Sequence, residues 1–492
     1  MKPYILSIDQ GTTSTRAVLF NRKGELCHIA QKEIKLLYRK PSWVEVDALE
    51  IWISTTEVVN EVLIKANIDF NEIDSIGITN QRETTVVWDK KTGIPVAPAI
   101  VWQSNQTQDI CDSLVGNIES IRSKTGLPLN PYFSASKMRF ILNSIENGQK
   151  RAENGELMAG TIDTWILYRI TSKSSFFTDV SNASRTLLFN IYEKKWDMEL
   201  LKIFNIPVCL LPEVKPSSFN FGSASFFGTD TPVCGIAGDQ QASLFGHACF
   251  NKGEIKNTYG TGCFMLLNTG ETPSFSENGL ITTIGWEIDD KVTYVLEGSV
   301  FVAGAAVQWL RDQLEFIEHV DQSEWIALES DYNHEIVVVP AFTGLGAPYW
   351  DPLAKGAIFG IERDTSKKDI TRATLEAIAF QAKDVFHAME KDANIKIKEL
   401  CVDGGASENN YLLQFQANLL NAKIIRPSCY ENTALGACFL SGLHTGFYES
   451  QDYIKSLKSD NVIFKTKFSK EEVNKHYRLW KIAVKAVRHF KK

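Results

Sequence analysis

The sequence has no two cysteines at the C-x-x-C spacing. Its nine cysteines are scattered from Cys27 to Cys438, and their number is odd. A dispersed, odd set in a long chain fits reduced thiols better than a disulfide framework, and it lacks the paired ligands of a structural zinc site. We therefore expect a cytoplasmic protein without disulfides.

An excess of positive charge is missing as well. The 492 residues carry a formal net charge of -7, which argues against a general nucleic-acid-binding protein. Long hydrophobic runs are absent, since the most apolar long window, residues 298–310, is too short to span a bilayer. The N-terminus does not resemble a signal peptide. The sequence thus predicts about two to three globular domains, with no membrane span and no nucleic-acid partner.

A P-loop is absent too, because no Gly-Lys-Ser/Thr follows the first glycine-containing turn. In residues 5–20, two apolar runs flank Asp9, Gly11, four consecutive hydroxyl residues and Arg16. Such a pattern predicts a β-hairpin. Turn N–H groups and hydroxyls suit phosphate oxygens, Asp9 could hold Mg²⁺ through water, and Arg16 could neutralise a transferred phosphoryl group. A hydroxyl-rich turn without a ligand is the alternative.

The rest of the chain alternates between strand-like and helix-like patterns. Residues 257–267 repeat the opening hairpin's pattern, so the sequence predicts an α/β protein with one such hairpin in each half. Further strands are expected at 25–34, 73–79, 84–89, 233–238, 292–296, 337–339, 356–361 and 400–402. Helices are expected at 48–65, 136–144, 161–170, 240–250, 298–313, 370–391, 411–420 and 475–492, and polar loops at 182–185 and 219–231.

Several residues at element ends are candidate ligand contacts. Arg82 and Glu83 follow a strand, where they form either a surface ion pair or a clamp for a small hydroxylated ligand. Trp102 and Tyr132 are either core aromatics or ligand contacts. Asp239 precedes a helix, either as a cap or as a general base.

Two segments of the second half each allow two interpretations of their function. The glycine turn at 403–410 leads into a helix, which is typical of a plain turn and also of a cradle for a nucleotide. The basic helix at 475–492 has a regular apolar face. We expect this face to pack on the body of the protein, and a nucleic-acid or membrane contact is the alternative.

Five motifs occur in a fixed order along the chain. They are Asp9-Gln-Gly-Thr-Thr-Ser, Gly77-Ile-Thr-Asn-Gln-Arg-Glu-Thr-Thr, Gly238-Asp-Gln-Gln, Asn257-Thr-Tyr-Gly-Thr-Gly-Cys-Phe-Met and Val402-Asp-Gly-Gly-Ala. Together they resemble the FGGY family of carbohydrate kinases, in particular its kinases of glycerol. The resemblance implies two actin-like, ribonuclease-H-like domains with a cleft between them. Residues 1–248 would bind glycerol and phosphate, and residues 249–492 would bind the nucleotide.

The resemblance further implies ATP-dependent phosphorylation of glycerol to sn-glycerol 3-phosphate in glycerol catabolism, with ATP and Mg²⁺ as cofactors, by a homo-oligomer (a dimer or tetramer). Asp239 would be the general base, and Asp9 and Asp239 would hold the metal. Matching positions imply phosphate contacts from Thr12, Thr13, Ser14 and Arg16, and nucleotide contacts from Thr261, Gly304, Gln308, Gly405 and Asn409. Glycerol hydroxyls would bind to Arg82, Glu83, Tyr132, Asp239 and Gln240, with Trp102 and Phe264 against its carbon face.

Two other functions stay open at this point. One is a related kinase that acts on a pentulose or an erythritol-like polyol, and the other is a non-catalytic, actin-like ATP-binding scaffold. Some bacterial relatives are regulated by fructose 1,6-bisphosphate or by histidine phosphorylation in the region that corresponds to residues 219–231. This stretch contains no Arg, Lys or His, and Ser225 stands about where the histidine would be. We therefore expect insensitivity to both regulators.

Overall fold

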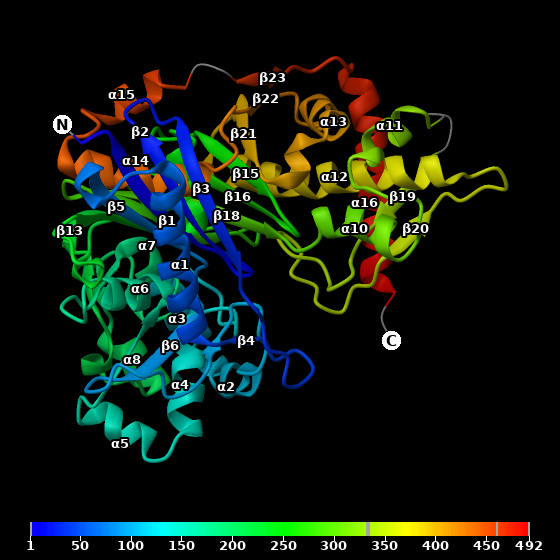
Figure 1. The fold of residues 1–492 in the computed structure, drawn as a ribbon. Helices are drawn as coiled ribbons and strands as arrows, with labels where there is room; N and C mark the ends of the chain where they lie inside the picture. Colours follow the sequence, from blue (N-terminus) through cyan, green and yellow to red (C-terminus); the bar gives the residue numbers. More distant parts are fainter. Residues whose placement is uncertain (1, 331–334, 459–460, 491–492) are drawn as a thin grey trace.

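The computed structural model describes residues 2–330, 335–458 and 461–490, and it contains two large mixed β-sheets covered by helices (Figure 1). The first sheet has the order β13-β14-β5-β1-β2-β3. Its meander β1–β2–β3 is antiparallel, β5 and β14 run parallel to β1, and β13 is an antiparallel edge. The strands are β1 (Tyr4–Gln10), β2 (Ser14–Asn21), β3 (Leu26–Glu33), β5 (Ile73–Asn80), β13 (Ser218–Ser223) and β14 (Pro232–Gly238).

The second sheet repeats this arrangement, in the order β17-β18-β16-β15-β21-β22-β23. Here β15, β16 and β18 form the antiparallel meander, and β21 and β22 continue parallel to β15. The prediction of one hairpin in each half is therefore confirmed. The strands are β15 (Ile255–Tyr259), β16 (Cys263–Gly270), β17 (Ile281–Ile288), β18 (Lys291–Val300), β21 (Glu399–Asp403), β22 (Lys423–Arg426) and β23 (Val462–Phe464).

Smaller sheets and short helices complete the first half. Strands β4 (Glu45–Val46), β7 (Ala99–Ile100), β6 (Thr85–Asp89) and β8 (Leu157–Thr161) form a four-stranded sheet, and β9 (Phe177–Asp179) pairs with β12 (Glu213–Lys215) and β10 (Phe189–Asn190) with β11 (Lys195–Trp196). The helices are α1 (Ala48–Ala66), α2 (Gln108–Ser113), α3 (Ile118–Thr125), α4 (Ser134–Ser144), α5 (Gly148–Glu153), α6 (Ile162–Ile170), α7 (Val180–Ala183), α8 (Met198–Phe204) and α9 (Asp239–Gly246).

The second half is richer in long helices. Its longest, α12, begins at a capping box in which the side chains of Ser366 and Asp369 satisfy free backbone N–H groups. Strands β19 (Val337–Val339) and β20 (Ala357–Phe359) form a hairpin. The helices are α10 (Gly304–Asp312), α11 (Gln322–Leu328), α12 (Lys367–Ala393), α13 (Asn410–Leu420), α14 (Asn432–Thr445), α15 (Gln451–Ser456) and α16 (Lys470–His489).

Helix α14 belongs to the second half of the chain, yet it packs on the first sheet. Figure 1 shows it in orange beside the blue strands β1 and β5, and it also contacts β14 and α9. Glycines allow this approach, because a Cβ on Gly436 would lie 1.8 Å from the carbonyl oxygen of Ala242, and one on Gly246 would lie 2.0 Å from that of Asn432. Helices α9 and α14 therefore touch backbone to backbone, and one hydrophobic cluster joins both halves.

Three local predictions are wrong. Residues 182–185 are not a loop throughout, because the buried helix α7, which Asp179 caps through the N–H groups of Ser181 and Asn182, continues to Ala183 before a turn at 184–185. Residues 219–231 are not a loop throughout, since β13 pairs with β14. The helix expected at 298–313 begins only at Gly304, because β18 continues to Val300.

The C-terminal helix supports the packing interpretation. Its apolar face, which includes the buried Trp480 and Val484, lies against β19, α12 and α13. The indole N–H of Trp480 donates to Oδ2 of Asp384 on α12 at 2.7 Å. In the parts of the chain that the structure describes, no helix is both long and apolar enough to cross a membrane.

Candidate active site

The first hairpin places Asp9 and Arg16 opposite each other on β1 and β2. A guanidinium nitrogen of Arg16 lies 3.6 Å from Oδ2 of Asp9 and 3.5 Å from Oε2 of Glu431, which belongs to the second half. The N–H of Gly11 donates to the carbonyl of Ser14 at 2.9 Å and closes the turn. The hairpin therefore presents one arginine between two carboxylates beside a compact turn.

The hydroxyl residues of this turn differ in exposure. Thr13 is exposed, Ser14 is buried, and the hydroxyl of Thr12 accepts a hydrogen bond from the indole N–H of Trp102 at 2.8 Å. The fourth hydroxyl belongs to Thr15, which is hydrogen-bonded to Ser54 at 2.8 Å inside the protein. Thr15 thus has a structural partner, whereas Thr12 and Thr13 lie at the surface of the turn.

Asp9 is a buried carboxylate at the end of β1. Burial raises its pKa to about 7, although the nearby Arg16 opposes this shift. No group of three or more His, Cys, Asp or Glu side chains is arranged to hold a metal within residues 2–330, 335–458 and 461–490. Mg²⁺ does not require such a cage, because it keeps several waters and is often held by one or two carboxylates and the substrate phosphates. The charge of Asp239 adds to the raised pKa of Asp9, so these two carboxylates could hold this ion together.

The second hairpin turn lies against the start of α10. The carbonyl of Thr261 accepts hydrogen bonds from the N–H groups of Ala303 and Ala305, at 2.8 and 3.0 Å. A Cβ on Gly304 would lie 2.6 Å from the carbonyl oxygen of Gly260, so only glycine fits there. Gln308 is exposed one turn further along α10. The structure thus brings Thr261 and Gly304 together.

The glycine turn after β21 reaches the same region. Gly404 has a φ of +83°, and a Cβ there would lie 2.4 Å from the carbonyl oxygen of Tyr259, just before the second hairpin turn. Gly405 is exposed with open space around its Cα. The side chain of Asn409 caps α13 by accepting from Leu412 N–H at 2.9 Å, and a nucleotide contact from it stays a prediction.

Arg82 and Glu83 are not a surface ion pair. Arg82 is 3% exposed and Glu83 is 1% exposed. The Nε of Arg82 lies 3.1 Å from Oδ1 of Asp239, the first residue of α9, whose side chain is 29% exposed. The buried Arg82 thus pairs with the carboxylate of Asp239, which is partly exposed at the surface of the site.

An aromatic group lies beside these charges. The ring of Trp102 meets that of Tyr132 edge to face at 5.6 Å between centroids, and that of Phe264 at 6.3 Å. All three side chains are half-buried, and Phe264 comes from the second hairpin. This arrangement offers an apolar wall to which both halves of the chain contribute.

Sequence reasoning missed Lys256, which is buried beneath Gln240. Its ammonium donates to the side-chain oxygen of Gln240 and to the hydroxyl of Thr258. Burial lowers the pKa of Lys256 to about 8, while the carboxylates of Asp403 and Asp239 oppose this shift. Lys256 holds the side-chain oxygen of Gln240, and the amide N–H₂ group is the part of that side chain that could donate to a ligand.

Sequence reasoning also missed Arg185 and Glu297. Arg185 Nε lies 2.6 Å from Oε1 of Glu83, and its Nη2 lies 3.0 Å from Oε1 of Glu297. Arg185 stood in the segment expected to be a polar loop. A single carboxylate within the otherwise apolar segment 295–298 was the available signal for Glu297.

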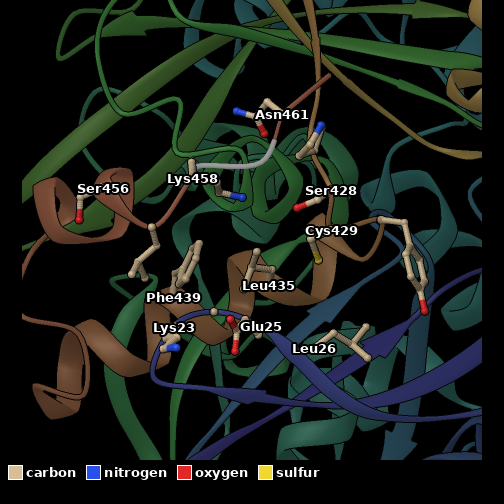
Figure 2. Close-up of a pocket in the computed structure, with 14 residues that line it drawn as sticks. Lys23, Glu25, Leu26, Ser428, Cys429, Leu435, Phe439, Ser456, Lys458 and Asn461 are labelled. Atoms are coloured by element: carbon tan, nitrogen blue, oxygen red, sulfur yellow. The ribbon is translucent and has the colours of Figure 1, made fainter. Parts of the chain in front are cut away.

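A separate cavity of about 530 Å³ lies between the β2–β3 turn, α14 and the segment after α15 (Figure 2). The residues that line it include Lys23, Cys429, Phe439 and Lys458. None of the predicted site residues lines this cavity, so it is distinct from the candidate active site.

The model of the N-terminal domain of the FGGY family of carbohydrate kinases matches residues 4–246, and that of the C-terminal domain matches residues 255–444. The chain belongs to the FGGY family of carbohydrate kinases. This FGGY kinase is 53% identical to a glycerol kinase of Oceanobacillus iheyensis, with 99% of each chain covered. It is 52% identical to a glycerol kinase of Staphylococcus epidermidis, with 100% and 99% covered.

Solved structures resemble the FGGY kinase over nearly its full length. A Plasmodium falciparum glycerol kinase with ADP superposes with a TM-score of 0.92 at 36% identity, and 98% of each chain is covered. A xylulose kinase from Lactobacillus acidophilus gives a TM-score of 0.87 at 22% identity, with 98% and 97% covered, which shows the shared fold alone. The expected two-domain, actin-like α/β fold is confirmed.

Proposed function

We propose that this kinase transfers the γ-phosphoryl group of ATP to glycerol, which gives sn-glycerol 3-phosphate and ADP. The observation that carries this proposal is the contact of Arg82 with Asp239 at 3.1 Å, next to the aromatic wall of Trp102, Tyr132 and Phe264. A small triol needs polar partners for its hydroxyls and an apolar surface for its carbons. The names of the full-length relatives support the same substrate.

Each glycerol-binding residue has a separate task. Arg82, Glu83, Tyr132 and Gln240 bind hydroxyls, and Trp102 and Phe264 pack against the carbon atoms. Asp239 accepts the proton of the attacking hydroxyl as that oxygen meets the γ-phosphorus atom. Positioning and charge neutralisation provide most of the catalysis.

The two hairpins and the glycine turn hold the nucleotide in this proposal. Asp9 and Asp239 would hold Mg²⁺, which would supply positive charge to the phosphates. Residues 1–248 bind glycerol and phosphate, and residues 249–492 bind the nucleotide. A homo-oligomer and a cytoplasmic location stay predictions. The phosphate contacts are Thr12, Thr13, Ser14 and Arg16, and the nucleotide contacts are Thr261, Gly304, Gln308, Gly405 and Asn409.

A substrate panel tests this function. ADP release is measured with ATP, Mg²⁺ and either glycerol, erythritol or a pentulose. We expect glycerol to give the highest kcat/KM, because the Arg82–Glu83 pair beside the aromatic side chains of Trp102 and Phe264 favours a small triol. Preference for a pentulose or erythritol would assign the enzyme to another branch of the family. A protein that binds ATP but releases no ADP with any of the three would be a scaffold.

A further inference from the structure

We infer that Glu297, contributed by the second half of the chain, is a positioning residue that fixes Arg82 for binding of the polyol. This inference rests on the proposed function. It adds a residue that does not itself touch the substrate and that belongs to the half assigned to the nucleotide.

The geometry is a closed ring of alternating charges. Both oxygens of Glu297 accept from the terminal nitrogens of Arg82, and the Nη2–Oε1 distance is 3.2 Å. The ring continues from Glu297 to Arg185 at 3.0 Å and from Arg185 to Glu83 at 2.6 Å. It closes between Arg82 Nε and Glu83 Oε1 at 4.0 Å. Within the ring, Glu297 holds Arg82 and Arg185 holds Glu83, and neither Glu297 nor Arg185 is a proposed ligand residue.

The contacts of Arg82 show what Glu297 determines. The guanidinium has five N–H donors in one plane. Its Nε faces Asp239, its Nη1 also donates to the side-chain oxygen of Gln241 at 3.3 Å, and Glu297 binds both terminal nitrogens. A bidentate carboxylate sets the plane of a guanidinium as well as its position. One N–H of Nη2 is left for a ligand, and Glu297 determines its direction.

Burial makes this support strong. The side chains of Glu297 and Arg185 are 0% exposed and that of Arg82 is 2% exposed, so water cannot replace the lost contacts. Burial alone would raise the pKa of Glu297, but Arg185 and Arg82 outweigh it and hold the pKa at about 2. Glu297 is therefore a carboxylate anion throughout the working range of pH.

The test compares Glu297→Gln with the unmodified enzyme. The amide keeps the size of the side chain but places N–H groups against the donors of Arg82, which then turns toward Asp239. We expect the glycerol KM to rise by about tenfold or more, since small displacements of positioned groups have effects up to about 100-fold. The ATP KM should change by less than about threefold. In an Arg82→Ala background, adding Glu297→Gln should change the glycerol KM by less than about threefold, because Glu297 acts through Arg82.

Glu287→Gln is the matched control. Glu287 is buried on the neighbouring strand β17, and its Oε1 pairs with Lys194 of the first half at 2.7 Å, outside the ring. The Glu287→Gln variant should have the same glycerol KM and ATP KM as the unmodified enzyme. Glu297→Asp keeps the negative charge that pairs with Arg82, and it should give a smaller rise in the glycerol KM than the amide.

Three results would overturn the inference. They are an unchanged glycerol KM in both Glu297 variants, an equal rise in the ATP KM, or the same effect from Glu287→Gln. If the unmodified enzyme itself shows no glycerol-dependent ADP release, the proposed function fails instead, so the two failures are distinguishable.

Discussion

Asp239 is held from two sides. Arg82 approaches its Oδ1 at 3.1 Å, and the backbone N–H of Gln240 donates to the same oxygen at 2.7 Å. As the first residue of α9, Asp239 also lies at the positive end of the helix dipole, which favours a carboxylate. Both contacts are made by Oδ1, and Oδ2 takes part in neither. That oxygen is suited to accept a proton from a substrate hydroxyl.

Asp239→Asn should lower kcat by about 10²–10⁴ while ATP still binds, because the amide cannot accept the proton. The measurement is steady-state ADP release together with calorimetric titration of ATP. Asp230→Asn, at an exposed position outside the site, is the control. A variant that keeps more than about a tenth of the parental kcat would rule out Asp239 as the general base.

A second buried pair links α9 to β21 near the site. His247 Nε2 lies 3.0 Å from Oδ2 of Asp403. Burial alone would lower the pKa of His247, but the Asp403 carboxylate outweighs it, so the pKa is raised. Burial alone would raise the pKa of Asp403, but the charge of His247 outweighs it and holds that pKa well below its usual range.

This pair predicts a pH-dependent stability. The contribution of His247 to the free energy of unfolding is complete below its ordinary pKa of about 6.5, and it is lost as the pH rises through the raised pKa of the folded state. The contribution of Asp403 is complete above about 3.9 and is lost as the pH falls through its lowered value. The melting temperature of the parent should exceed that of His247→Gln most between these limits and less above neutral pH. A difference that does not vary with pH would contradict the pairing.

Single residues could be predicted only where a motif or the family resemblance identified them. Arg82 and Asp239 lie in short segments that resemble the family, and the structure pairs them. Trp102 lies outside these segments and was predicted from the resemblance as a whole, and the structure pairs it with Tyr132. Glu297 and Arg185 could not be predicted, because their partners are 215 and 102 residues away in sequence. No local pattern encodes a contact of that separation.

At the scale of elements, local patterns predicted the two hairpins and long helices such as α1, α12 and α13, but not how α14 docks. The buried residues of α14 include ten of the first eleven positions, so it has no polar face to show which side meets solvent. Its contacts with α9 and the first sheet depend on glycines that sequence periodicity does not reveal. The domain boundary expected at residue 248 stays a prediction. Helix α14 follows this boundary in the sequence but packs on the sheet that precedes it.

Gly436→Ala should therefore destabilise the protein by about 1–3 kcal/mol or more, because the added methyl group forces the backbones of α14 and α9 apart. In an open helical position the same substitution would stabilise the helix by about 0.5–1 kcal/mol. Gly116→Ala is the control, since a Cβ there meets nothing within 4 Å. The measurement is the midpoint of urea denaturation. Equal midpoints for both variants would show that α14 is less tightly packed than described.

At the scale of the whole molecule, the site depends on both halves of the chain. The connection from β5 to β6 supplies Arg82 and Glu83, the segment after β7 supplies Trp102, and the second sheet supplies Phe264 and Glu297. The repeated strand order places the two hairpins in equivalent positions on the two sheets. Closure of the halves around glycerol and ATP would exclude water and so prevent hydrolysis of ATP.

The most direct measurement is ³¹P NMR of the products formed from ATP, Mg²⁺ and glycerol. The proposed site predicts that ADP and glycerol 3-phosphate appear in equal amounts, and that ATP stays intact when glycerol is omitted. Release of ADP with inorganic phosphate in place of the phosphoester, at the same rate with and without glycerol, would contradict phosphoryl transfer to glycerol at this site.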